Sequence, residues 1–146
     1  MKHLRTLLLL GALFGLSGMV GCAATGGAQH QEKVVYHVND SAVAKAAMNN
    51  VKNHLSADPD AKIVIVTHGK GVDFLFEGAT DKDGNPYNVN VEELQAMGVK
   101  FDVCANTLKS RKLDRSKLLL GMVVVPSGVA EIGKLQSSEG YVYLKP

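Results

Sequence analysis

Residues 62–67 (KIVIVT) form a continuous apolar run, which restricts the fold more than any other part of the sequence. Such a run is typical of a central parallel strand, because helices bury both faces of a parallel sheet. Strands are expected at residues 33–38, 62–67, 99–103, 121–125 and 140–144, and helices at 42–55, 72–78, 91–97, 104–112 and 128–138. This alternation predicts an α/β fold with a mainly parallel sheet of about five strands and helices on both faces.

Polar residues and glycines predict where the helices begin and end. Asn39–Ser41 supplies a cap for the first helix, and Asn90 is expected to cap the helix at 91–97. Gly98 follows that helix, as glycine often does at a helix end.

The amino-terminal segment has the pattern of a secretory signal peptide. Lys2 and Arg5 precede an apolar stretch at residues 7–20, and small residues follow. That order predicts a signal over residues 1–21. The stretch is too short to favour a membrane-spanning helix. We therefore expect an exported protein, located in the periplasm.

The end of the signal leaves two readings open. Residues 19–22 (MVGC) are similar to the lipobox of bacterial lipoproteins, in which Cys22 would be the lipidated first residue and an anchor to the membrane. The alternative is ordinary cleavage after Ala23, Ala24 or Ala28. In either case residues 22–32 read as a flexible tether, and residues 33–146 as one folded domain.

The charge balance argues against nucleic acid as a partner. The chain holds 16 Lys and Arg against 14 Asp and Glu, and residues 1–21 carry two of the basic groups and no acidic one. The remainder is thus balanced at 14 of each, with no long basic block. Nucleic-acid binding depends on such a block.

Cys104 is the principal candidate for chemistry. Sites in open α/β sheets lie beyond the carboxyl ends of the strands, where residues 67–69, 104–107 and 126–128 are expected to meet. At a strand-to-helix junction, backbone N–H groups and the helix dipole favour a thiolate. If Cys22 is lipidated or removed, Cys104 has no partner within the chain. The thiol is then reactive, paired between molecules, or simply a small buried hydrophobic group.

Several segments together resemble one known family. They are residues 103–108 (VCANTL), Thr67-His68-Gly69, residues 124–129 (VVPSGV) and the ending at 140–146 (GYVYLKP). In order and spacing they are similar to the small DsrE/F-like (YchN-like) proteins. The resemblance implies a three-layer flavodoxin-like fold that assembles as a trimer or hexamer. It also implies that Cys104 aligns with the cysteine that carries sulfur as a persulfide in the sulfur-relay members.

The resulting hypothesis is a sulfur carrier or sulfurtransferase-like protein of the cell envelope. Cys104 would take sulfur from a donor protein and pass it to an acceptor thiol, without a metal or organic cofactor. This is closer to carriage than to enzymatic turnover. The alternative is a non-catalytic oligomeric binding protein in which Cys104 is structural.

The neighbours of Cys104 have two readings each. His68 would orient or deprotonate the thiol, or be an ordinary turn histidine. Asn106 and Thr107 would hydrogen-bond the sulfur or only cap a helix. Gly69 and Ser127 are the remaining candidates for binding the substrate.

Three other kinds of site find little support. Cys104 and His68 lack further metal ligands at a recognisable spacing. Residues 81–92 mimic a calcium loop, but Pro86 occupies the position that requires glycine, so a solvated turn is expected. The sequence contains no phosphate-binding loop motif.

Overall fold

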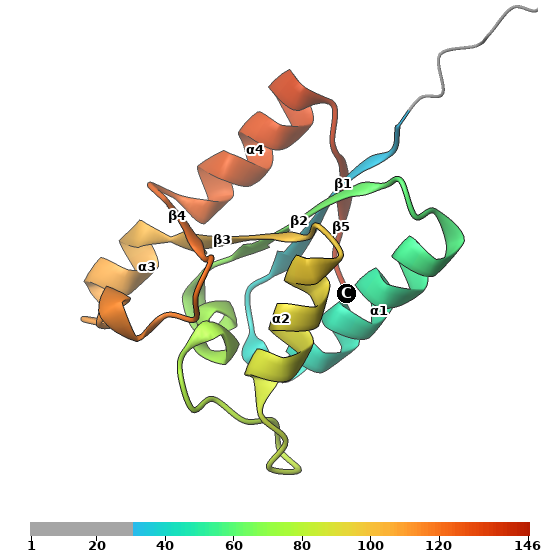
Figure 1. Cartoon of the computed structure of the whole chain (residues 1–146). Helices are drawn as coiled ribbons and strands as arrows, with labels where there is room; N and C mark the ends of the chain where they lie inside the picture. The colour runs from blue at the N-terminus through green and yellow to red at the C-terminus, as the bar shows by residue number, and fades with distance from the viewer. Residues whose placement is uncertain (1–30) are drawn as a thin grey trace, which may run out of the picture.

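The computed structural model describes residues 31–146, which form a five-stranded sheet whose strands are all parallel. The strands are β1 (Lys33–Val38), β2 (Lys62–Thr67), β3 (Lys100–Cys104), β4 (Val123–Val125) and β5 (Val142–Leu144). Their order across the sheet is β4-β3-β2-β1-β5 (Figure 1). The α/β prediction and the central place of the 62–67 strand are confirmed. The predicted signal peptide, Cys22 and most of the tether lie outside the described residues.

Helices cover the sheet on both sides and give three layers (Figure 1). On one face lie α1 (Ala44–Ala57), α2 (Tyr87–Ala96) and the 3-10 helix Gly69–Leu75, and on the other lies α4 (Gly128–Glu139). The short helix α3 (Ala105–Ser110) follows β3 directly, and 3-10 turns occupy Ser41–Val43 and Arg115–Lys117. None of these helices, within residues 31–146, is long and apolar enough to cross a membrane.

The strand residues alternate between two cores, as pleated strands require. Ile63, Ile65 and their neighbours pack under α1 and α2, whereas Val35, Val64 and Val66 pack under α4. The first core is much the larger because one helix alone covers the second face.

One predicted helix cap is wrong. The helix expected at 91–97 begins at Tyr87, directly after Pro86, which is in the extended conformation. Proline suits this place because its φ is fixed and its missing N–H would have no partner in the first turn. Asn90 therefore lies inside α2, where its side chain accepts a hydrogen bond from Lys52 Nζ at 2.9 Å. Asp40 does cap a short helical turn, within the segment that the sequence indicated, and Asp114 caps another.

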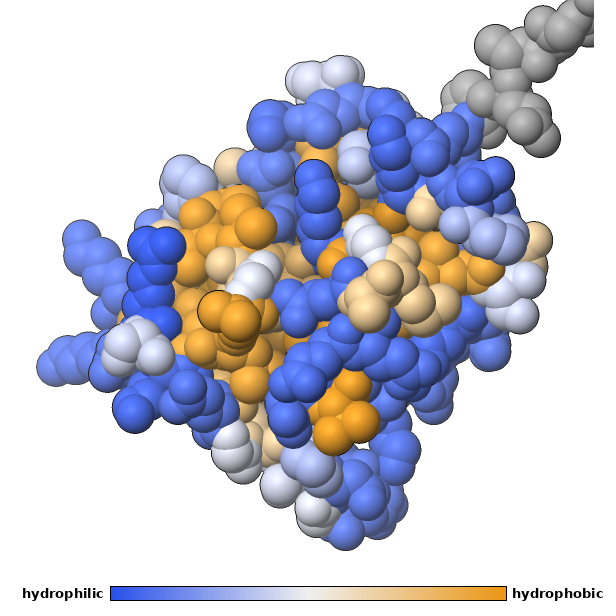
Figure 2. All heavy atoms as spheres, viewed as in Figure 1, coloured by the Kyte–Doolittle hydropathy of each residue, from blue (hydrophilic) through white to orange (hydrophobic). Residues whose placement is uncertain are grey.

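The edge of the sheet at β4 carries exposed apolar side chains. Leu120 and Val123 are 93% and 47% exposed, and Val129 at the start of α4 is 65% exposed. Figure 2 shows a hydrophobic area over β4 and the adjoining chain. Edge strands are usually covered by other structure, so these side chains are candidates for contact with another protein chain.

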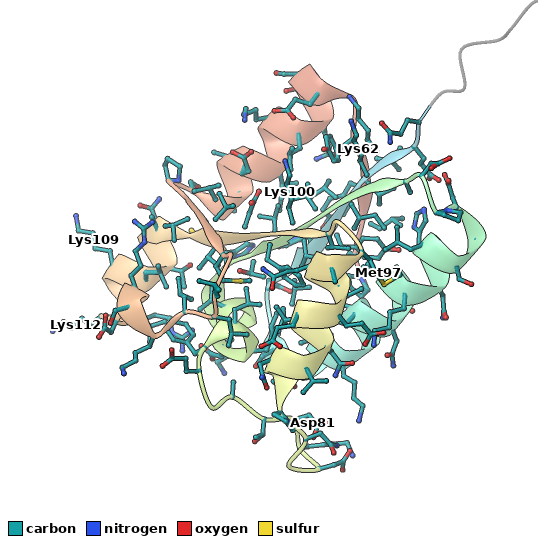
Figure 3. The ribbon with its side chains drawn as sticks, in the orientation of Figure 1. Lys62, Asp81, Met97, Lys100, Lys109 and Lys112 are labelled. Atoms are coloured by element: carbon teal, nitrogen blue, oxygen red, sulfur yellow. The ribbon has the colours of Figure 1, made fainter. Side chains whose placement is uncertain are left out.

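A buried carboxyl group lies on the sheet face that α4 covers, beside β4. Asp102 is 6% exposed and lines a cavity of about 440 Å³ between α4 and β4. Lys100, which Figure 3 labels, lines the same cavity. Burial, together with the charge of Glu131, raises the pKa of Asp102 to about 6. Desolvation disfavours the charged form of an acid, so the folded state prefers the neutral carboxyl.

Asp102 is expected to make stability fall as the pH rises. Its folded pKa lies above the ordinary value for an unfolded chain, so its contribution is complete below pH 4 and is lost as the pH passes through 6. A shift of two units corresponds to roughly 3 kcal/mol at most. Asp102→Asn should therefore be more stable than the wild type at pH 7.5 but not at pH 4, in urea unfolding. Asp60→Asn, at an exposed aspartate, is the control; equal profiles for the wild type and Asp102→Asn would contradict this account.

Candidate functional site

Cys104 and His68 lie side by side at the carboxyl edge of the sheet, on the face that α4 covers. Thr67 pairs with Val103 in the β2–β3 register, so the next residues, His68 and Cys104, are level with each other. Thr67 is buried, and its hydroxyl donates a hydrogen bond to the carbonyl of Asp102 at 3.0 Å. This bond holds the two strand ends together just before the candidate residues.

Gly128, the first residue of α4, fills the place between them. A Cβ at Gly128 would lie 3.3 Å from the Cβ of Cys104, 3.3 Å from the Cβ of His68 and 3.1 Å from the carbonyl oxygen of Thr67. Because both Cβ atoms lie the same short distance from this point, the side chains of Cys104 and His68 leave the backbone close to each other. Only glycine lets the backbone of α4 approach so closely.

Cys104 is the N-cap residue of α3 and lies beside the first residue of α4, so its sulfur is near the N-termini of two helices. Burial by itself raises the pKa of this thiol, but four donors outweigh it and lower the pKa below the ordinary value. They are the backbone N–H groups of Gly128, Thr107 and Asn106 and the hydroxyl of Thr107. Donors to the charged form favour the thiolate, which is the nucleophilic form of cysteine.

Thr107 is held in place by the turn after β2. Its hydroxyl oxygen accepts a hydrogen bond from the N–H of Gly69 at 3.0 Å, so its own proton is available to the sulfur. Arg111 braces the same turn, donating to the carbonyl of Gly69 at 2.8 Å and to Asp73 at 2.7 Å. Gly69 has a φ of 58°, a conformation that favours glycine.

The remaining sequence candidates take part mainly through the backbone or as caps. The Ser127 hydroxyl oxygen accepts from the N–H of Ala130 at 3.4 Å and caps α4. The Asn106 side chain is exposed, and its N–H is the group directed at the sulfur.

His68 is engaged by a residue that the sequence did not single out. Its Nε2 lies 2.7 Å from Nε2 of His37, and Nδ1 of His37 lies 2.7 Å from the hydroxyl of Tyr143. Both histidine pKa values are lowered, chiefly by burial. The available signal was the strand period: His37 is two residues after the core residue Val35 and so faces α4.

Metal ligands are sparse in the part of the chain that the structure describes. No group of three His, Cys, Asp or Glu side chains there is placed to hold a metal ion. In the calcium-like loop, Asp81 Oδ1 accepts from the N–H groups of Asp83 and Asn85 at 2.9 Å, and Lys45 donates to Oδ2 at 2.9 Å. The Asp81 carboxylate thus holds its own turn closed.

Gly128→Ala is expected to raise the pKa of Cys104. The added methyl group would push α4 away from the sulfur and lengthen the N–H contact of Gly128. Loss of one such donor should slow alkylation by iodoacetamide at pH 7 about tenfold, one pKa unit. Gly133→Ala, in the same helix with nothing within 4 Å, is the control. An unchanged pH profile of alkylation in Gly128→Ala would count against the role given to this N–H.

The site and fold define a small parallel α/β protein with a buried cysteine of lowered pKa at the carboxyl end of its sheet. The model of the DsrE/DsrF-like family matches residues 23–146, and the chain belongs to this family. Sulfur relay is the function generally associated with it.

Solved structures agree with this assignment. The chain is similar to the protein of unknown function MTH1491 from Methanobacterium thermoautotrophicum, with 31% identity and a TM-score of 0.71. It is also similar in fold to the ychN protein from E. coli, with 16% identity and a TM-score of 0.66. Each match covers 80% of this chain and 100% of the other. No curated protein matches the sequence.

Proposed function

We propose that the protein is a sulfur carrier of the cell envelope that holds sulfane sulfur as a persulfide on Cys104. The observation that carries the proposal is the position of Cys104 at two helix N-termini: it is the N-cap residue of α3 and lies against Gly128, the first residue of α4. The direction of the pKa shift agrees with this position, because the pKa of the thiol is lowered although burial alone would raise it. Membership of the DsrE/DsrF-like family supports the same chemistry.

The exchange needs no oxidant or reductant. The thiolate of Cys104 attacks the outer sulfur of a donor persulfide, R–S–S⁻, and a new bond forms between the two sulfur atoms. The S–S bond of the donor breaks, and its electron pair leaves on R–S⁻. An acceptor thiolate then repeats the attack on the outer sulfur of Cys104, and the leaving thiolate is stabilised by the donors around it.

The envelope location rests on the sequence. Residues 1–21 have the signal-peptide pattern, and Cys22 stands where a lipid would be attached. Sulfur donors and acceptors would then be thiol proteins of the periplasm, reached by a chain that is exported and anchored through Cys22.

A homo-oligomer, a trimer or a hexamer, is part of the proposal. The exposed apolar side chains Leu120, Val123 and Val129 gather at the unpaired edge of β4 (Figure 2). Contiguous apolar surface of this kind is typical of contacts between proteins.

One observation favours the alternative of a non-catalytic binding protein. Cys104 is only 5% exposed, so a donor reaches the sulfur only if α4 or the turn at Gly69 moves. A structural cysteine would need no such movement.

Intact-mass spectrometry of the full chain after incubation with inorganic polysulfide distinguishes the two functions. Persulfide carriage predicts a gain of one or more sulfur atoms that dithiothreitol removes. Absence of any gain, together with no alkylation of Cys104 by iodoacetamide in the folded protein, would reject carriage and leave the binding protein.

A further inference from the structure

Three titratable side chains form a row across neighbouring strands on the α4 face. Tyr143 of β5 pairs in register with Val35, whose side chain faces α4. His37 follows two residues later on β1, and His68 is two residues beyond Val66 of β2, which also faces α4. The strands β5, β1 and β2 are adjacent (Figure 1), so the row runs toward Cys104 on β3.

Hydrogen bonds connect the row from end to end. The Tyr143 hydroxyl lies 2.7 Å from Nδ1 of His37, and the Nε2 atoms of His37 and His68 lie 2.7 Å apart. The two imidazole rings are stacked, with centroids 4.7 Å apart and planes inclined by 30°. Tyr143 is 37% exposed and so reaches solvent at the far end of the row.

The Nε2-to-Nε2 contact restricts where the protons lie. One of the two nitrogen atoms must carry a proton and the other must accept it. If Tyr143 donates to His37, then His37 carries its proton on Nε2 and His68 carries its proton on Nδ1. In the opposite state His68 donates from Nε2, His37 donates from Nδ1 to the Tyr143 oxygen, and Nδ1 of His68 is bare. Within residues 31–146, no hydrogen bond of the structure occupies Nδ1 of His68.

The surroundings keep both rings neutral. Burial disfavours the imidazolium form of His37 and of His68, and the positive charge of Lys145 acts on both in the same direction. Neutral rings joined in this way pass a proton along by exchanging tautomers and do not store it. A metal ion between the rings would need further ligands, and the described residues provide no third one.

We propose that Tyr143, His37 and His68 form a proton relay between solvent and the sulfur at Cys104, with His37 and Tyr143 acting as positioning residues for His68. The inference deepens, and in its sulfur-transfer role rests on, the proposed function of Cys104. The side chains of His68 and Cys104 both begin beside Gly128, so a thiol bound at Cys104 lies close to the His68 ring.

The relay acts when the persulfide is handed on. An acceptor thiol R–SH gives its proton to the bare Nδ1 of His68 and attacks the outer sulfur of Cys104–S–S⁻. The bond between that sulfur and Cys104 breaks, and its electron pair remains on the Cys104 thiolate. Protons shift along His68, His37 and Tyr143, and one leaves to solvent. The balance is R–SH and Cys–S–S⁻ giving R–S–S⁻, Cys–S⁻ and H⁺, with no net oxidation.

Tyr143→Phe is the sharpest test, because it removes one hydroxyl and keeps the ring. Persulfide-loaded protein is mixed with free cysteine as the acceptor, and the rate of sulfur loss from Cys104 is measured from pH 6 to pH 9 by rapid-quench mass spectrometry. Without the relay the acceptor must ionise alone, so its rate should rise about tenfold per pH unit up to its pKa near 8.5. The wild-type rate should be nearly flat, and about tenfold higher than the variant at pH 6.5. His37→Phe should behave in the same way.

Tyr141→Phe is the matched control, since it removes the hydroxyl of a tyrosine that packs on the same face of the sheet and does not belong to the row. It should keep the wild-type pH profile. If Tyr143→Phe and His37→Phe keep that profile too, the relay is overturned.

A second readout separates failure of the relay from failure of sulfur carriage. In the full chain without any sulfur donor, nitrogen-15 NMR of the imidazole rings reports the tautomers of His37 and His68. The relay predicts that Tyr143→Phe changes the tautomer populations of both rings, whereas Tyr141→Phe changes neither. Coupled rings in a protein that never loads sulfur would reject only the proposed function. Rings that do not respond to Tyr143→Phe would reject the relay, whether or not Cys104 loads.

Discussion

Cys104→Ser is expected to lose all uptake of sulfane sulfur. The serine hydroxyl occupies nearly the same space and can accept from the N–H groups of Gly128, Thr107 and Asn106, so the fold should persist. It does not ionise near neutral pH and cannot form a persulfide. Intact mass after treatment with polysulfide should therefore show no added sulfur, with an unfolding midpoint close to that of the wild type.

The full chain contains a built-in control, because Cys22 is its only other cysteine. Cys22→Ser should load sulfur as the wild type does and release it to dithiothreitol at the same rate. If loading persists in Cys104→Ser and disappears in Cys22→Ser, the carrier has been assigned to the wrong cysteine.

Gly71→Ala should strongly destabilise the fold, and more than alanine at any other glycine described. A Cβ at Gly71 would overlap the carbonyl group of Val38 at the end of β1, lying 2.6 Å from its carbon and 2.9 Å from the carbonyl carbon of Asn39. Both are backbone atoms, so no side chain can move aside. The 3-10 helix also carries buried Phe74 and Leu75, which would have to shift with it. We expect a loss of about 3 kcal/mol or more in the free energy of unfolding.

Thermal unfolding measures this loss, and the midpoint should fall by about 10 °C or more. Gly133→Ala supplies the opposite case, because its helix site is open and alanine favours a helix by roughly 0.5–1 kcal/mol. The same 3-10 helix begins with Gly69, which donates to Thr107, so Gly71→Ala should also slow alkylation of Cys104. A Gly71→Ala midpoint equal to the wild type would mean that the two segments approach less closely than described.

The sequence predicted the sheet well, because its central strands β1, β2 and β3 are largely buried on both faces. The 62–67 run has no polar break, and only a central parallel strand accommodates it, which is where β2 lies. The start of α2 was predicted too late because Asn90 is a favoured capping residue. Pro86 instead starts the helix through its fixed φ and makes no capping hydrogen bond. The local pattern could not decide between them.

The site was only partly predictable for a different reason. Cys104 and His68 end segments that any parallel sheet brings to one edge, so position along the chain was sufficient to select them. His37 lies inside a strand that reads as ordinary β structure, and its bond to His68 depends on the β1–β2 register, in which His37 pairs with Val66. The register between two strands joined by a helix is set by tertiary packing, so the local sequence does not reveal it. Tyr143 depends in turn on the pairing of the last strand with the first.

Because every strand runs in the same direction, the sheet has a polarity that extends to the whole molecule. Lys33 begins β1 at one edge, whereas Cys104 ends β3 at the opposite one, about 20 Å away across a six-residue strand. Any attachment made through residues before Lys33 would hold the protein by the edge opposite the cysteine. A molecule fixed to a surface in this way would present its thiol outward, with the donor and acceptor approaching from the free side.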